Sequence, residues 1–226
     1  MTAIAIFLRP ERIVFGSDSR VCSRDEDGGT WTGSAQKIRR AGRWNYLVGG
    51  YIAHPGATRD MFTIVDAAIR DATTIRAAME AVYRDVSVMI VDAFAALHRR
   101  GQVPMLQVFV GGVEGGRLVV GHLEAKVTGH DPFRVSCGAG VSTEGYGDAN
   151  GEISFTATVA DDGPALTLMQ APRPAWVQRG DIEAARRLLA LQCAATPDLV
   201  AAPIHILEIT ATGSRTLTDH GQEIDR

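Results

Sequence analysis

The stretch at residues 2–20, TAIAIFLRPERIVFGSDSR, decides how the fold begins. It contains two short apolar runs, residues 3–8 and 13–16, on either side of the turn-like sequence Arg9-Pro10-Glu11. Short apolar runs bounded by turn residues are typical of strands, and continuous apolar runs of strands buried on both faces. We therefore expect a buried β-hairpin here. The polar, Gly-rich residues 22–34 that follow predict a loop.

Strand-like and helix-like patterns then follow one another in groups. Apolar residues three and four apart predict a helix at 62–69 and a second one of about 25 residues that stops at Gly101. Asp181 can cap a third helix that runs through Cys193. Strands are expected at residues 44–50, at 106–111 and 118–123 around the turn GGVEGG, at 133–137, and at 204–210.

This grouped order predicts the α+β class with largely antiparallel sheets, because a parallel sheet would need alternating βαβ units. Each helix is apolar along one stripe and should cover a sheet face. The sequence has no internal repeat, low-complexity tract or linker. We therefore expect a single domain over residues 1–226, with an unusual segment rich in Gly, Pro and Asp at about 148–180.

The composition excludes several classes of protein. With 226 residues, 46% of them apolar, the chain can bury a sizeable core without disulfides or metal. The formal net charge of −3 argues against capture of nucleic acid. No stretch approaches the ~20 apolar residues of a membrane span, and the run at 3–8 is too short for a signal peptide. We expect a soluble cytoplasmic protein without nucleic-acid or membrane partners.

The cysteines and histidines predict neither a disulfide framework nor a metal centre. The 3 cysteines lie far apart without CxxC spacing, and the 6 histidines form no HExxH motif. Cys137 could be a nucleophile, but no neighbouring residue suggests its activation, and a lone cysteine between apolar residues is more often part of a core. We expect no metal or other cofactor.

Thr2 is the first residue whose position suggests chemistry. A small second residue permits removal of Met1, which would leave Thr2 at the N-terminus. A free N-terminal Thr combines a hydroxyl nucleophile with an α-amino group whose pKa of about 7.7–8.0 lets it accept the hydroxyl proton near neutral pH. The alternative is that Thr2 has no such role, since many cytosolic proteins begin with Met-Thr or Met-Ser.

Three further features follow Thr2, and each also has a structural interpretation. Asp18, in the sequence GSDSR, could anchor a cation at a strand end or simply belong to a polar turn. Lys37 could hold positive charge beside a nucleophile, or lie on a solvated basic edge. The pair Gly49-Gly50 could offer an N–H to an oxyanion, or form an ordinary turn.

The order and spacing of these features resemble the proteasome β-subunit family of N-terminal nucleophile (Ntn) hydrolases. The matching segments are Thr2-Ala3-Ile4, the GSDSR segment at 16–20 with Arg20 at the family's arginine, Lys37 in QKI, and the glycines that end a strand. The resemblance implies a four-layer αββα sandwich of two antiparallel sheets. It also implies Thr2 as nucleophile and base, Lys37 as the tuning charge, Asp18 as its partner and Gly49 N–H as the oxyanion donor.

The second half of the chain departs from the family pattern. Ala139 in Gly138-Ala139-Gly140 stands where the family has a supporting serine, for which Ser136 or Ser142 could substitute. Asp198 fits the family's aspartate after the last long helix, but Ala201 stands at the serine three residues later. These departures leave Thr2, Lys37 and Asp18 in place. They are also compatible with a protein that has kept the fold but lost catalytic activity.

The resemblance implies a threonine-type peptidase similar to stand-alone bacterial members of the family. Such a protein would assemble with itself into a ring of six or seven subunits or a double ring and act on peptides or unfolded proteins. Whether it also has an unfoldase partner stays open. By motif, Arg39, Leu47 and Tyr51 should lie on one face and border the substrate pocket, with mixed apolar and acidic preference. The alternatives are a non-catalytic ring-forming scaffold and a small-molecule amidase.

Overall fold

The computed structural model describes residues 3–9, 11–24, 30–52, 59–99, 105–128, 134–142 and 180–217. The chain divides into two compact units, one formed by Met1–Ile38 with Glu144–Arg226 and the other by Arg39–Thr143. The first unit therefore joins the two ends of the chain. A single domain over 1–226 stays a prediction. Of the unusual segment at 148–180, only Gly180 lies within the described residues.

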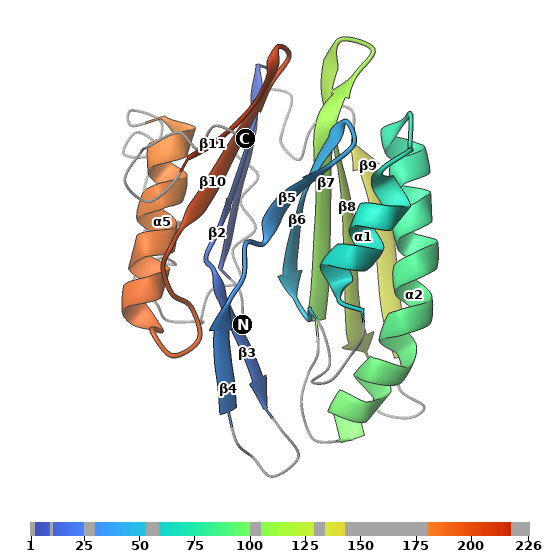
Figure 1. Cartoon of the computed structure of the whole chain (residues 1–226), viewed down its shortest axis with the longest axis vertical. Helices are drawn as coiled ribbons and strands as arrows, with labels where there is room; N and C mark the ends of the chain where they lie inside the picture. Colours follow the sequence, from blue (N-terminus) through green and yellow to red (C-terminus); the bar gives the residue numbers. More distant parts are fainter. Residues whose placement is uncertain are drawn as a thin grey trace. The chain divides into compact units, whose positions relative to one another are not determined.

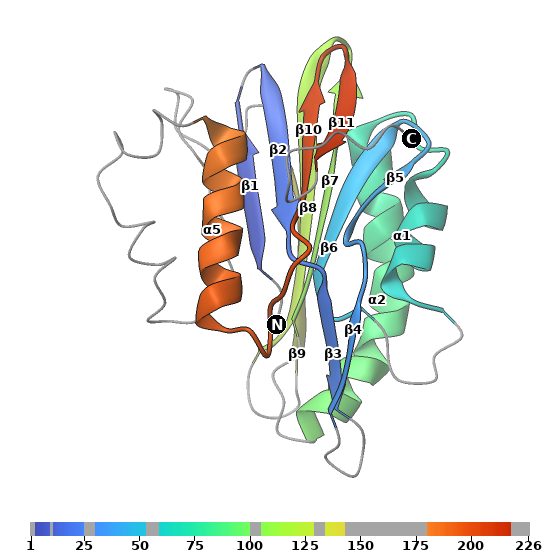
Figure 2. The same cartoon turned by 60° about the vertical axis from the view of Figure 1, so that its left-hand side comes forward.

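The first unit contains a four-stranded antiparallel sheet with the order β1-β2-β10-β11. Its strands are β1 (Ile4–Leu8), β2 (Arg12–Ser17), β10 (His205–Thr210) and β11 (Gly213–Leu217). The predicted hairpin is confirmed, since β1 pairs with β2. Helix α5 (Asp181–Ala195) packs against β1, β2 and β10 and covers one face of this sheet (Figure 1; Figure 2). Phe7, Val14 and Leu188 belong to the core between them.

Helix α5 begins one residue earlier than the sequence pattern predicted. Gly180 is the N-cap residue, with no side-chain hydrogen bond, so the predicted capping role of Asp181 is wrong. Asp181 is the first residue of the helix, and its carboxylate accepts from the guanidinium of Arg9, with Nη2 at 2.9 Å from Oδ1. A carboxylate in the first turn still complements the positive end of the helix dipole. The ion pair joins the end of β1 to the start of α5.

The predicted loop at 22–34 is also wrong, because strands β3 (Arg20–Arg24) and β4 (Thr30–Ser34) form an antiparallel ribbon there. Polar, Gly-rich composition led to the loop prediction. Polar composition indicates that a segment is exposed to water, but it does not determine the backbone conformation. A solvated two-stranded ribbon can therefore have the same composition as a loop. Val21 and Thr32, residue types that favour strands, lie in the two halves of the ribbon.

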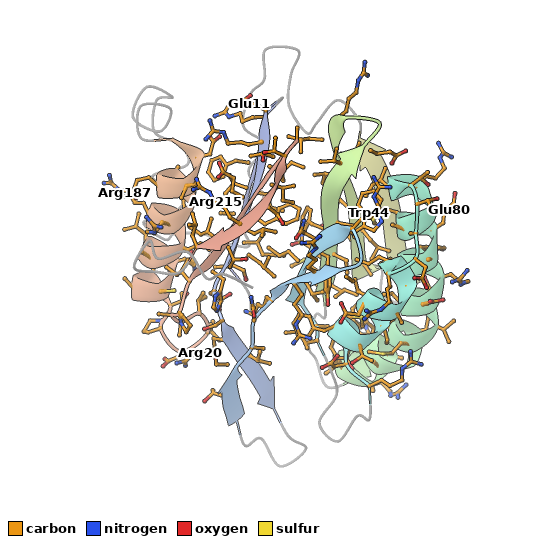
Figure 3. All side chains as sticks on the ribbon, turned by 45° about the horizontal axis from the view of Figure 1, so that its top comes forward. Glu11, Arg20, Trp44, Glu80, Arg187 and Arg215 are labelled. Atoms are coloured by element: carbon orange, nitrogen blue, oxygen red, sulfur yellow. The ribbon has the colours of Figure 1, made fainter. Side chains whose placement is uncertain are left out.

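The second unit is a five-stranded antiparallel sheet with the order β5-β6-β7-β8-β9. Its strands are β5 (Ile38–Ala41), β6 (Trp44–Gly50), β7 (Met105–Glu114), β8 (Arg117–Thr128) and β9 (Arg134–Ser142). Helix α2 (Ile75–Arg99) packs against β7, β8 and β9, and α1 (Met61–Ile69) packs against α2 and β6 (Figure 1). Trp44, labelled in Figure 3, donates its indole N–H to the carbonyl of Ala72 on the helix side of this sheet.

The periods in the sequence explain the helices of this unit. The buried residues of α2 recur three and four apart: Ile75, Ala78, Met79, Val82, Val86, Ile90 and Phe94. This helix has 25 residues, and its predicted length is confirmed. The turn between β7 and β8 uses only the last two glycines of GGVEGG. Gly115 and Gly116 have φ of 57° and 78°, the positive values that a tight two-residue hairpin needs.

The predicted fold class is confirmed: the chain is α+β, with antiparallel sheets that helices cover on one face. Among the described helices, none is long and apolar enough to cross a membrane.

Candidate active site

Asp18 and Lys37 form a buried ion pair in the first unit. Asp18 follows β2 directly and Lys37 directly precedes β5, so the ends of two strands carry the two groups. Nζ of Lys37 lies 2.7 Å from Oδ1 of Asp18, and both side chains are 0% exposed. A buried lysine or carboxylate is strongly unfavourable unless it is paired and hydrogen-bonded. The structure therefore brings together two of the predicted site residues and contradicts the solvated-edge interpretation of Lys37.

The carboxylate of Asp18 also accepts two main-chain N–H groups. The amide of Ala3 donates to Oδ1 at 3.0 Å, and the amide of Arg20 donates to Oδ2 at 2.9 Å. The N–H of Asp18 in turn donates to the carbonyl of Ala3 at 3.3 Å. With Lys37, these contacts give the buried carboxylate partners on both oxygens, as a desolvated charge requires. Asp18 thus joins the start of β1, the end of β2 and the segment before β5.

Thr2, the predicted nucleophile, lies outside the described residues. Its position in the chain still connects it to the ion pair. The carbonyl carbon of Thr2 is covalently bonded to the nitrogen of Ala3, and that nitrogen donates to Asp18.

Asp198 lies in the turn after α5 and is exposed. Its main-chain carbonyl accepts a hydrogen bond from Nη1 of Arg20 at 3.3 Å. Three residues on, the carbonyl of Ala201 accepts from both the N–H and the hydroxyl of Ser19. Figure 3 labels Arg20 where β3 begins. The structure therefore brings the turn after β2 and the 198–201 segment together, and these contacts use main-chain carbonyls of that segment.

Gly49 belongs to the second unit, near the end of β6, where it pairs in register with Gln107 of β7. The next-but-one residue, Tyr51, donates its N–H to the carbonyl of Met105 at 2.8 Å. The predicted role of the Gly49 N–H as an oxyanion donor stays a prediction.

The three predicted pocket residues do not share one face of the sheet. The guanidinium of Arg39 lies 3.8 Å from the ring centroid of Phe62 in α1, and the ring of Tyr51 meets Phe94 of α2 edge-on at 5.6 Å. Both side chains therefore lie on the helix side of the sheet.

Leu47 points to the opposite face. It is fully buried, and its neighbour Tyr46 reaches the carbonyl of Phe62 on the helix side with its hydroxyl. Because successive residues of a strand point to opposite faces, Leu47 faces away from the helices. The prediction failed since Gly50 has a φ of 82°, which interrupts the strand alternation between Leu47 and Tyr51.

Residues 134–142 form β9, in which Ala139 pairs in register with Leu123. The side chains of Ser136, Cys137, Ala139 and Ser142 lie outside the description. Their predicted roles therefore stay predictions.

Sequence reasoning missed the two serines beside Asp18. Ser17 is 0% exposed and donates its hydroxyl to the carbonyl of Asp18, and Ser19 is 1% exposed and reaches Ala201. In the sequence, the signal that could have indicated them is a serine on either side of Asp18 in GSDSR, because buried polar side chains need hydrogen-bond partners. No group of three potential metal-ligating side chains occurs among the described residues.

Comparisons with known proteins give a likeness of structure only. No protein-family model and no curated protein sequence matches the chain. The structure is similar to Anbu, the ancestral β-subunit from Yersinia bercovieri, with a TM-score of 0.48 and 11% identity over 97% of this chain and 87% of that chain. It is also similar to the eukaryotic HslV of Trypanosoma brucei, with a TM-score of 0.47 and 13% identity over 93% of this chain and 99% of that one.

At this identity and TM-score, any proposal about function must be based on the contacts of this chain's own residues.

Proposed function

We propose that the chain is a threonine-type peptidase in which removal of Met1 makes Thr2 the N-terminal nucleophile. One observation carries the proposal: the buried Asp18–Lys37 pair binds the amide of Ala3, the residue joined to Thr2. The positive charge of Lys37 is then held near the start of the chain. A nearby cation lowers the pKa of an amine and stabilises developing negative charge.

The use of lysine at this position supports a chemical role. Of the 23 Lys and Arg residues, only Lys37 and Lys126 are lysines. Arginine is the residue that usually serves in buried ion pairs, because its guanidinium is less strongly hydrated. A chain that otherwise relies on arginine therefore has a compact ammonium group at the buried pair. A pair kept only for stability could be replaced by apolar residues at little cost.

In the proposed reaction, Oγ of Thr2 attacks the carbonyl carbon of the scissile peptide bond and its proton passes to the α-amine. The tetrahedral intermediate collapses as the C–N bond breaks, and the amine returns the proton to the leaving nitrogen. The resulting ester between Thr2 and the acyl product is then attacked by water, which releases the carboxylic acid and regenerates the hydroxyl. Lys37 supplies positive charge near the nucleophile, and Asp18 holds it in place.

The proposal extends to assembly and substrate. The protein would act in the cytoplasm on peptides or unfolded proteins, inside a ring made of copies of itself. No cofactor is required by this chemistry. Asp198 would act through the main-chain contact with Arg20, and the N–H of Gly49 would be the oxyanion donor.

A non-catalytic ring-forming scaffold is the second candidate. The observation that favours it is Ala201: the hydroxyl expected at this position is missing, and its main-chain carbonyl is bound by Ser19. Reaction with an electrophilic probe for N-terminal threonine separates the two candidates. A peptidase has Thr2 labelled once Met1 is absent, whereas a scaffold without a working amine and hydroxyl does not react.

A further inference from the structure

Ser19 contacts two separate segments of the first unit. Its main-chain N–H and its hydroxyl both donate to the carbonyl of Ala201, at 3.1 and 3.2 Å. Its own carbonyl accepts the N–H of Ala35 at 2.8 Å. Ala35 stands two residues before Lys37, and Asp18 is the covalent neighbour of Ser19. Ser19 is therefore connected to both members of the buried ion pair and to the segment after α5.

Because Ser19 is buried, water does not compete for its hydrogen bonds. The residue is 1% exposed, so water cannot replace the hydroxyl bond to Ala201 without a change in the turn. A buried polar group that loses its partner is destabilising, whereas the partners of an exposed one are readily exchanged for water. Arg20 adds a further bond from the same turn to the carbonyl of Asp198. The geometry thus fixes the Asp18 turn against the 198–201 segment from two adjacent residues.

We propose that Ser19 is a positioning residue, whose hydroxyl holds the Asp18 turn in place and keeps the ammonium group of Lys37 buried against Asp18. The hydroxyl acts on the pair through the main chain and touches no reacting atom. Only the effect of the Asp18–Lys37 pair on catalysis rests on the proposed function. The positioning itself can be measured in a protein that has no turnover.

The experiment measures the acylation rate of Lys37 by acetic anhydride in the full chain, using peptide mass spectrometry. Lys126 is the only other lysine and serves as the internal reference within each molecule. Four proteins are compared: wild type, Ser19→Ala, Ser19→Thr and Ser87→Ala. Ser87 is the matched control, because its hydroxyl also donates to a main-chain carbonyl, that of Tyr83 in α2.

We expect Ser19→Ala to raise the Lys37 rate relative to Lys126 about fivefold, as the loss of one hydrogen bond allows. Ser19→Thr keeps the hydroxyl and returns the ratio toward wild type, and Ser87→Ala leaves it unchanged. An unchanged ratio in folded Ser19→Ala would overturn the proposal, as would an equal rise in Ser87→Ala. If Ser19→Ala does not fold, hydrogen exchange in the wild type decides: slow exchange at both Ser19 and Ala35 amides supports the role, and fast exchange at either contradicts it.

The same four proteins also distinguish this inference from the proposed function. If wild type reacts with the threonine probe, Ser19→Ala should react about fivefold more slowly at neutral pH, with its pH profile displaced upward, and Ser19→Thr should recover. If wild type does not react at all, the peptidase proposal fails, and the acylation ratio still decides the role of Ser19.

Discussion

The amide nitrogen of Ala3 lies 3.0 Å from Oδ1 of Asp18, the oxygen that Lys37 contacts at 2.7 Å. One buried carboxylate oxygen therefore binds both the start of the chain and the ammonium group. This arrangement relates a local main-chain contact to the proposed chemistry, because the residue before Ala3 would carry the nucleophile. Variants at this pair should change stability and reactivity together.

Replacing Lys37 by Ala leaves Asp18 as a buried carboxylate without its cation. We expect a loss of ~3 kcal/mol in the free energy of unfolding, since breaking a buried pair strands the remaining charge. Probe labelling of Thr2 should fall by at least ~100-fold, the scale of a lost electrostatic stabiliser. Lys37→Arg should not restore labelling, because the planar guanidinium is bulkier than an ammonium. Urea titration and labelling kinetics measure the two effects.

The matched control is Arg84→Ala, which removes a cation from an exposed ion pair with Asp85. It should change stability by no more than ~0.5 kcal/mol and leave labelling unaltered. Equal labelling of wild type and Lys37→Ala would remove Lys37 from the mechanism.

A double variant separates the stability of the pair from its chemistry. Asp18→Asn with Lys37→Met removes both charges and retains one side-chain oxygen, which can replace the acceptor of Ala3 N–H or of Arg20 N–H but not both. Because apolar replacement of a whole buried pair is often neutral, we expect the double variant to be more stable than Lys37→Ala by ~2 kcal/mol or more. Its Thr2 should nevertheless stay unreactive. Calorimetry and probe labelling test this; a double variant with wild-type labelling would show that the charges are dispensable.

His122 should make the stability of the protein depend on pH. Burial lowers the pKa of this imidazole from its ordinary value of 6.5, against an opposing effect of Glu124. The folded state therefore favours the neutral form, so this contribution is complete above about pH 6.5 and is lost as the pH falls through the lowered pKa. His122→Phe preserves a ring to stack on Phe109, which the imidazole now contacts at 4.1 Å between centroids.

The comparison uses urea midpoints of wild type and His122→Phe between pH 7.5 and 4.5, a range chosen to span the titration of histidine. The difference between the two proteins should shift in favour of His122→Phe on acidification. A difference that is independent of pH would contradict the assignment, and carboxylates that titrate in both proteins cancel from it.

Self-assembly is tested independently of catalysis. A ring of six or seven copies of the 24.2 kDa chain, or a double ring, should elute as a single large species in size-exclusion chromatography with light scattering. Thr2→Ala should assemble in the same way, because the nucleophile is not needed to form the ring. A monomer at micromolar concentration would contradict the assembly proposal.

The sequence predicted those features that depend on local periodicity or on residue type. The length of α2 followed from apolar residues such as Met79 and Val86 recurring on one face. Asp18 and Lys37 were found because their types and spacing match a family pattern, and the structure pairs them at 2.7 Å. The antiparallel class followed from the grouped order of strands and helices.

What the sequence could not predict depends on contacts between distant residues or on single backbone angles. The role of Ser19 depends on Ala201, which lies far along the chain. The positive φ of Gly50 broke the alternation that had placed Leu47 and Tyr51 on one face. The β3–β4 ribbon was missed because pairing of main-chain groups leaves little trace in the composition of a solvated segment.

The proposed peptidase mechanism requires a free and reactive Thr2, and one measurement on the purified wild type tests both properties. Intact mass spectrometry before and after incubation with an electrophilic N-terminal-threonine probe reports both. We expect a starting mass without Met1 and a single added probe that maps to Thr2 and is absent from Thr2→Ala. A chain that retains Met1, or one that lacks Met1 but takes up no probe at Thr2, would contradict the mechanism.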